Sequence, residues 1–301
     1  MRERLKAIRD AAAPLAQASR EAAARPVPGL VASLRAWRGQ SEAPTPARRG
    51  IAVVAITRHG IALAGRVVAA LPGAQLYCPE KFKAEAEAAA PGAAHTYVGK
   101  VGDQVPALFA AFDGIVAIVS LGAVVRLIAP HLKSKEVDPA VVVLDEGGKF
   151  AIPILSGHLG GANALAGHLA TAIGAQAVLT TASDSRGTIG VDILGRELGW
   201  TTEATHDELV RCSAAVVNDE PVALVQEAGS KDWWTNHANG RKGPKPTNVS
   251  EFSRLEDVAP DTFAAVLWIS QREMPEVYKA RLAGRSVTYR PPQDKTGETN
   301  Q

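Results

Sequence analysis

The sequence has little cysteine, few aromatic residues and almost no net charge. Its two cysteines, Cys78 and Cys212, lack CxxC spacing, which argues against a disulfide framework or a cysteine zinc site and predicts a reducing, cytoplasmic location. Aromatic residues make up 5% of the 301 residues, whereas 27 glycines and 19 prolines supply many turns, a composition unlike a long coiled coil. The net charge of +2 is too small for the concentrated basic surface that nucleic acids require, so no nucleic-acid partner is expected.

Common catalytic and targeting signatures are also missing. The sequence contains no GxxxxGK[ST], GxGxxG, HExxH or GxSxG motif, which weakens nucleotide-dependent, zinc-protease and esterase interpretations. The N-terminus lacks the continuous apolar run of a secretory signal. Residues 150–183 contain no charged side chain, but Pro153, His158 and several glycines divide them into strand, loop and helix. No membrane partner is therefore expected.

From residue 51 onward, short apolar runs alternate with helical segments that carry one apolar face. Strands are expected at 51–56, 75–77, 96–98, 115–119, 140–144, 150–155 and 177–180, with helices at 61–71, 84–90, 105–112, 123–129 and 159–173. The turn at 145–149 contains two glycines, which permit positive φ, so it should join its flanking strands as a hairpin. The alternation predicts an α/β fold with a doubly wound, mostly parallel sheet.

The chain divides into four expected parts. Residues 1–49 carry ten Lys and Arg against four Asp and Glu, and form a basic extension that should be dispensable for folding. This extension either docks on an acidic surface or is a solvated helix without a partner. Residues 50–185 form the first α/β domain, 186–290 a second, smaller α/β domain, and 291–301 a tail. In the second domain, helices are expected near 191–198 and 206–214, strands near 222–226, 264–269 and 287–289, and a loop at 233–260.

Polar clusters follow several predicted strands, where open α/β sheets bind ligands. The strongest runs from Ser156 to Asn163, with the sequence SGHLGGAN. Its glycines can bring backbone N–H groups at a helix N-terminus close to an anion, and His158 can act as a general acid or base. The alternative is that Gly160 and Gly161 only allow close packing around a buried histidine. His168 is expected to be structural.

Other clusters offer cations and carboxylates. Ser120 could cap a helix that begins near Gly122, and Arg126 offers a fork for carboxylates. With Lys133 and Lys135, Arg126 could form a cationic rim for an acidic ligand, although a solvated charge run explains these residues equally well.

The remaining candidates are less specific. Asp145 and Glu146 could act as a carboxylate pair or could be a solvated turn. The hydroxyls of Thr180 and Thr181 and the carboxylate of Asp184 could bind ligand, although capping of a helix by Ser183 or Asp184 is an equal alternative. The Arg-His-Gly run at 58–60 is a weaker candidate of the same kind.

Taken in order, these clusters resemble the CbiG family of cobalamin biosynthesis, the cobalt-precorrin-5A hydrolases. The matching segments are 121–130, 133–135, 138–148, 156–163 and 180–184, with a looser resemblance over 186–290. The resemblance implies opening of the δ-lactone of cobalt-precorrin-5A with release of acetaldehyde. The substrate would be a small cobalt corrinoid rich in carboxylates. Because cobalt arrives inside the substrate, no separate cofactor and no protein-bound metal are expected.

The resemblance also suggests roles for individual residues. His158 would be the acid or base, and Asp145 or Glu146 would orient it or the water. Ser156, Asn163 and the backbone N–H groups near Gly160 and Gly161 would stabilise the oxyanion or hold side-chain carboxylates. The expected substrate-binding residues are Ser120, Gly122, Arg126, Lys133, Lys135, Gly160, Gly161, Asn163, Thr180, Thr181 and Asp184.

One departure from the family leaves an alternative open. The family commonly continues into a third, CobE-like domain, but only eleven residues follow Arg290. The chain could therefore be a carrier without activity of its own, or a subunit that needs a separate CobE-like protein. Contacts with other pathway enzymes and self-association also remain open.

Overall fold

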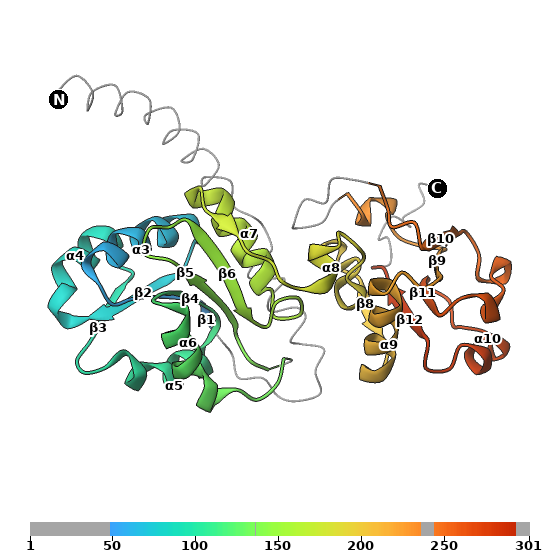
Figure 1. The fold of residues 1–301 in the computed structure, drawn as a ribbon, viewed down its shortest axis with the longest axis horizontal. Coiled ribbons are helices and arrows are strands. Elements are labelled where there is room, and N and C mark those ends of the chain that lie inside the picture. The colour runs from blue at the N-terminus through green and yellow to red at the C-terminus, as the bar shows by residue number, and fades with distance from the viewer. Residues whose placement is uncertain (1–48, 136, 236–243, 293–301) are drawn as a thin grey trace, which may run out of the picture. The chain divides into compact units, whose positions relative to one another are not determined.

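The computed structural model describes residues 49–135, 137–235 and 244–292. The chain forms two units that divide between Leu179 and Thr180, slightly before the boundary expected after residue 185 (Figure 1). The basic extension lies outside the described residues except for Arg49, with which the first strand begins. No helix within the described ranges has the length and apolar character needed to cross a membrane.

The first unit contains a sheet of seven strands in the order β3-β2-β1-β4-β5-β6-β7. The strands are β1 (Arg49–Ala55), β2 (Gln75–Pro79), β3 (Ala94–Tyr97), β4 (Phe112–Ile118), β5 (Ala140–Leu144), β6 (Phe150–Leu155) and β7 (Gln176–Ala177). The first five are parallel, β6 is antiparallel to β5, and β7 is parallel to β6. Strand β4 is buried along its whole length, as expected for a central parallel strand.

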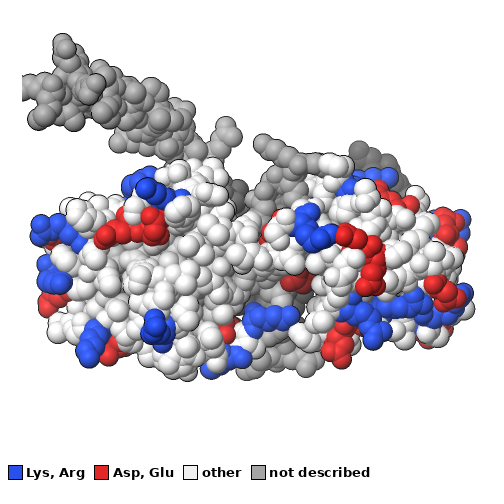
Figure 2. All heavy atoms as spheres, viewed as in Figure 1, with Lys and Arg blue, Asp and Glu red and all other residues white. Residues whose placement is uncertain are grey.

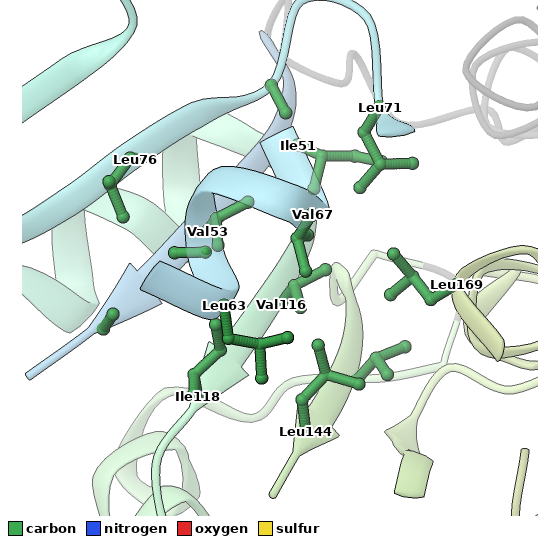
Figure 3. Close-up of a cluster of buried hydrophobic side chains, with 14 of the residues drawn as sticks. Ile51, Val53, Leu63, Val67, Leu71, Leu76, Val116, Ile118, Leu144 and Leu169 are labelled. Atoms are coloured by element: carbon green, nitrogen blue, oxygen red, sulfur yellow. The ribbon is translucent and has the colours of Figure 1, made fainter. Parts of the chain in front are cut away.

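Helices cover both faces of this sheet, so the prediction of a doubly wound α/β fold is confirmed (Figure 1). One face carries α3 (Arg58–Ala70), α4 (Lys83–Ala89) and α7 (Ala162–Ile173); the other carries α5 (Val101–Ala111) and α6 (Leu121–Ile128). Short 3-10 turns, η1 (Glu80–Phe82) and η2 (Ala129–His131), complete the unit. Figure 3 shows the first core, where Leu63 of α3 and Leu169 of α7 pack over Val53 and Leu144 of the sheet.

The hairpin between β5 and β6 reverses the direction of the chain. Leu144, the end of β5, pairs with Ala151, whereas Val141, near its start, pairs with Leu155 at the end of β6. The loop after β6 therefore lies at the edge where the parallel strands begin. We call this edge the amino edge and the opposite edge, where β1 to β5 end, the carboxyl edge.

The second unit has a five-stranded sheet in the order β10-β9-β11-β12-β8. Its strands are β8 (Thr201–Glu203), β9 (Val222–Gln226), β10 (Val249–Phe252), β11 (Ala265–Ile269) and β12 (Ser286–Arg290), and only β8 is antiparallel to its neighbour. Its helices are α8 (Ala182–Ser185), α9 (His206–Val217) and α10 (Glu276–Arg281). This smaller α/β unit was also predicted.

Two expectations for the second unit are wrong. The segment 191–198 is not a helix but two 3-10 turns, η3 (Val191–Ile193) and η4 (Arg196–Leu198), separated by Gly195 at φ 71°. A side chain at this glycine would collide with the ring of Trp200, so the break is fixed by packing. The segment 233–260, expected as a loop, contributes β10 as an edge strand. Further 3-10 turns are η5 (Lys231–Trp233), η6 (Leu255–Asp257) and η7 (Pro260–Thr262).

Candidate functional site

The loop between β6 and α7, residues 156–161, has an unusual backbone that we call the His158 loop. Ser156 has φ 54°, a left-handed conformation that non-glycine residues rarely adopt. Its carbonyl accepts the N–H of Ala162 at 3.1 Å, and the carbonyl of Gly157 accepts the N–H of Asn163 at 2.9 Å. These bonds tie the start of the loop to the first turn of α7. The side chain of His158 is half-buried in this loop.

Two glycines make the tight loop possible. A Cβ atom on Gly160 would lie 2.2 Å from the Cβ atom of Ser156, so any larger residue would push the loop apart. Gly161 precedes α7 at φ 84°, and its N–H donates to the carbonyl of His158 at 3.0 Å. Both glycines are buried, as is Asn163. The glycine positions that the sequence singled out are therefore needed for the shape of the loop, whatever the loop binds.

The loop of residues 133–135, the lysine loop, lies beside the His158 loop at the amino edge. It precedes β5, and Asp138 connects it to Ser156, whose hydroxyl donates to the Asp138 carbonyl at 3.1 Å. Lys133 and Lys135 are both exposed. The amino edge therefore combines two cations with a half-buried histidine and a helix N-terminus, a set that suits an anionic ligand.

A second group of candidates lies at the carboxyl edge. Ser120 occupies the N-cap position of α6, but its side chain makes no capping hydrogen bond, which corrects the expected role of its hydroxyl. Gly122 and Arg126 are exposed, and the Arg126 guanidinium donates to the Gly122 carbonyl at 2.9 Å. This bond turns Arg126 back toward the start of α6. The rim of Arg126, Lys133 and Lys135 stays a prediction.

The carboxylates after β5 also lie at the carboxyl edge. Asp145 Oδ1 accepts the backbone N–H groups of Lys149 and Phe150 at 2.8 and 2.6 Å, which makes it the residue that closes the hairpin turn. Glu146 is exposed and accepts the hydroxyl of Thr57, which caps α3 by accepting the Gly60 N–H at 3.0 Å. Thr57 was missed from the sequence, although a threonine after a strand and before an apolar-faced helix is a recognisable N-cap signal.

The two groups cannot form one catalytic centre within the first unit. The four residue-to-residue steps from Ala151 to Leu155 span about 13 Å, which separates the two edges of the sheet. The interpretation in which Asp145 or Glu146 orients His158 therefore does not fit the structure. The physical reason is the antiparallel direction of β6, which carries the His158 loop to the edge opposite the turn.

The last predicted cluster belongs to the second unit. Thr180 is the first residue of that unit, and Thr181 precedes the short helix α8 as its N-cap residue. The Thr181 hydroxyl donates to the carboxylate of Asp184, while Ser183 is buried inside α8. Thr181 occupies the N-cap position of α8 but makes no side-chain capping hydrogen bond, and Ser183 and Asp184 lie inside the helix, so the alternative in which one of them caps it is wrong.

Sequence reasoning missed a charged cluster at the carboxyl ends of β9 and β11. The Arg272 guanidinium donates to both oxygens of Glu227, at 2.8 and 2.6 Å, and also to Glu256 at 3.0 Å. Glu227 accepts the Leu255 N–H at 2.9 Å as well. Although burial raises the pKa of Glu227, hydrogen bonds from Arg272, Leu255 and Ser270 lower it to about 2. The cluster is an internal ion-pair network.

Other reactive side chains have structural surroundings. Burial, with a smaller contribution from Glu85, raises the pKa of the Cys78 thiol, and burial raises that of Cys212 to about 12. Both thiols stay protonated near neutral pH and are poor nucleophiles. The ring of His168 donates to the Ala70 carbonyl at 3.0 Å, which confirms its structural role. In the described ranges, no group of three or more His, Cys, Asp or Glu side chains is arranged to hold a metal ion.

The fold and the His158 loop define a two-unit α/β protein with a glycine-rich loop at a helix N-terminus. Comparison with known families identifies two matches, "Cobalamin synthesis G N-terminal" over residues 103–184 and "Cobalamin biosynthesis central region" over residues 189–291. No match to a C-terminal domain of the family is found. The chain belongs to the CbiG family of cobalamin biosynthesis, as its ordered motifs predicted.

Two relatives share the name cobalt-precorrin-5A hydrolase. The protein from Priestia megaterium is 39% identical over 250 residues, which cover 83% of this chain and 64% of the relative. The protein from Salmonella typhimurium is 30% identical over 229 residues, which cover 75% of this chain and 60% of the relative. The chain thus spans less than two thirds of the length of either relative.

A solved structure of a cobalamin biosynthesis protein G homolog from Sulfolobus solfataricus is also similar. It is 18% identical with a TM-score of 0.40, and the match covers 82% of this chain and 62% of that one.

Proposed function

We propose that this chain hydrolyses cobalt-precorrin-5A, opening its δ-lactone and releasing acetaldehyde. The proposal rests on the names of the relatives and on one observation, the strained His158 loop beside the lysine loop at the amino edge. Within the first unit this edge joins an imidazole that can accept and donate a proton to cations that can bind peripheral carboxylates.

The reaction needs two kinds of proton transfer. Water adds to the lactone carbonyl, and cleavage of the ester C–O bond leaves a carboxylate and a hydroxyethyl group. Removal of the hydroxyl proton then allows the carbon–carbon bond to break, so acetaldehyde leaves and the ring carbon takes up a proton. One water is consumed in total. His158 would remove and return these protons, because a half-buried imidazole is open to both ligand and solvent.

Backbone and cationic groups would stabilise the negative charge. The N-terminus of α7, a helix of 12 residues, would turn its positive dipole end toward the oxyanion or a carboxylate, while the N–H groups of Ala162 and Asn163 donate within the His158 loop. Lys133 and Lys135 would bind peripheral carboxylates of the macrocycle. The groups at the carboxyl edge of the first unit have no part in this arrangement.

The deciding experiment is an anaerobic assay of the purified chain with cobalt-precorrin-5A, with acetaldehyde as the product measured. Catalytic release would support the proposal. Tight binding of the corrinoid without turnover would favour the carrier alternative. Because the chain spans 64% of the Priestia relative, a second arm adds a separately expressed CobE-like protein. Release of acetaldehyde only in that arm would make this chain a necessary subunit.

The cofactor expectation has its own test. Cobalt belongs to the substrate, so we expect the purified, substrate-free chain to carry no stoichiometric metal and to need no nucleotide. Elemental analysis of the chain before and after chelation measures this. A stoichiometric metal whose removal abolishes turnover would contradict the expectation.

A further inference from the structure

A single buried residue, Asp138, connects the two loops of the amino edge. Asp138 is 4% exposed, and its two carboxylate oxygens accept the backbone N–H of Lys133 at 3.1 and 3.0 Å. Its own N–H donates to the Ser134 carbonyl at 2.9 Å. The side chain of Asp138 thus closes the lysine loop on itself. A carboxylate removed from water needs such donors, so the loop and the carboxylate stabilise each other.

The backbone carbonyl of the same residue holds the His158 loop. Ser156 donates its hydroxyl to the Asp138 carbonyl at 3.1 Å while its backbone keeps φ at 54°. The Ser156 carbonyl in turn accepts the N–H of Ala162, the first residue of α7, at 3.1 Å. A continuous path of hydrogen bonds therefore runs from Lys133 through Asp138 and Ser156 to the N-terminus of α7.

We propose that Asp138 is the positioning residue of this site. Its carboxylate fixes the lysine loop, and its carbonyl fixes the Ser156 turn, so one residue sets the cations and His158 relative to each other. The consequence for turnover rests on the proposed function. The structural link does not, because it depends only on contacts within the first unit.

Amide hydrogen exchange tests the link without any ligand. Asp138→Ala should accelerate exchange about tenfold in residues 130–135 and also in residues 156–165, because losing a charged acceptor raises the frequency of local opening. The matched control is Asp103→Ala. Asp103 also accepts a lysine backbone N–H, that of Lys100 at 3.1 Å, but at the carboxyl edge. This control should accelerate exchange only near the start of α5. Unchanged exchange at 156–165 in Asp138→Ala would overturn the proposal.

Ligand binding tests the functional consequence. The probes are cobyrinic acid, a cobalt corrinoid with free peripheral carboxylates, and cobinamide, in which these groups are amides. Asp138→Ala should weaken the binding of cobyrinic acid about tenfold and leave the binding of cobinamide nearly unchanged. The displaced lysine loop affects only a ligand that carries carboxylates. Asp138→Asn should recover most of the affinity, since its amide oxygen can still accept the Lys133 N–H. If Asp138→Asn loses as much affinity for cobyrinic acid as Asp138→Ala does, the role of Asp138 is merely structural and the proposal is overturned.

Kinetics separate this proposal from the proposed function. In the acetaldehyde assay, Asp138→Ala should raise KM and lower kcat. The substitution Ser156→Ala should lower kcat/KM less in the Asp138→Ala background than in the wild type, because both residues act through the same contact path. If the wild type makes no acetaldehyde while exchange changes in both segments, the proposed function fails and the link stands. If the wild type is active and Asp138→Ala has the same hydrogen exchange and kinetics, the proposed role of Asp138 is wrong and the proposed function stands. Should Asp138→Ala not fold, Asp138→Asn and Ser156→Ala carry the exchange test.

Discussion

The two units place charged residues at the carboxyl edges of their sheets and use them in opposite ways. In the second unit, Glu227 and Arg272 follow adjacent strands and bind each other, with only 13% of the Glu227 side chain exposed. In the first unit, Arg126 donates to a carbonyl of its own helix and forms no ion pair with any described residue. Both positions lie where doubly wound sheets commonly bind ligands.

The packing around each sheet explains the difference. Trp268 is fully buried on β11, and the guanidinium groups of Arg272 and Arg290 lie 5.7 and 5.6 Å from its ring. These cations lie beside carboxylates of their own unit, Glu227 after β9 and Glu203 in β8 (Figure 2 shows Lys and Arg beside Asp and Glu on the viewed face of this unit). Arg272 and Arg290 are thus paired within the second unit, whereas Arg126, Lys133 and Lys135 of the first unit are exposed.

The largest effect should come from His158, the proposed acid or base of the first unit. His158→Ala should lower kcat for acetaldehyde release about 10²- to 10⁴-fold, the range typical of a lost general acid or base. Thermal unfolding should change little because the side chain is only half-buried. His206→Ala, at an exposed position on α9 of the second unit, is the control. Wild-type turnover in His158→Ala would remove His158 from the mechanism.

The ion-pair network of the second unit should respond to pH. The pKa of Glu227, lowered to about 2 in the folded state, lies below its ordinary value near 4.5. Its contribution to stability is therefore present above about pH 4.5 and is lost as the pH falls toward 2. Glu227→Gln should lower the free energy of unfolding by about 1–3 kcal/mol at neutral pH.

Chemical denaturation from pH 7 down to pH 3 measures this prediction. The loss of stability between pH 4.5 and 3 should be smaller in Glu227→Gln than in the wild type. An identical acid profile in both proteins would show that the network does not stabilise the second unit.

A substitution of Asp145 should affect the stability of the β5–β6 turn but not the rate of turnover. Asp145→Ala removes two hydrogen bonds that close the β5–β6 turn and should lower the stability of the first unit by about 1–2 kcal/mol. Its kcat should stay within about twofold of the wild type, because the residue lies at the edge opposite His158. Urea unfolding and the acetaldehyde assay measure the two effects. A large loss of kcat in a folded Asp145→Ala protein would restore the carboxylate to the reaction centre.

The smallest effect is expected from the basic extension. Deleting residues 1–48 should leave the Tm of both units unchanged, because the sequence separates this segment from the first strand by several prolines. If the extension docks on an acidic partner, pull-down of that partner should weaken in high salt and disappear on deletion. A large drop in Tm would mean that the extension packs on the folded core.

The sequence alone determined the alternation of elements. Apolar runs such as 140–144 and 222–226 coincide with β5 and β9, because a buried parallel strand needs apolar residues on both faces. The ordered motifs also identified the family. Strand β10 was missed because it is an edge strand that pairs only with β9. Its partly exposed residues carry no apolar pattern that the sequence could reveal.

Only the tertiary structure decided which candidates share a site. The sequence predicted the hairpin at 145–149, and the structure shows its consequence for the site: β6 runs antiparallel to β5, so its end lies at the amino edge. Direction separates His158 from Asp145 and Glu146. It also brings Ser156 within hydrogen-bonding distance of Asp138, a residue 18 positions earlier in the chain. The sequence indicated the candidate residues, and the pairing direction of one strand decided which of them lie at the same edge of the sheet.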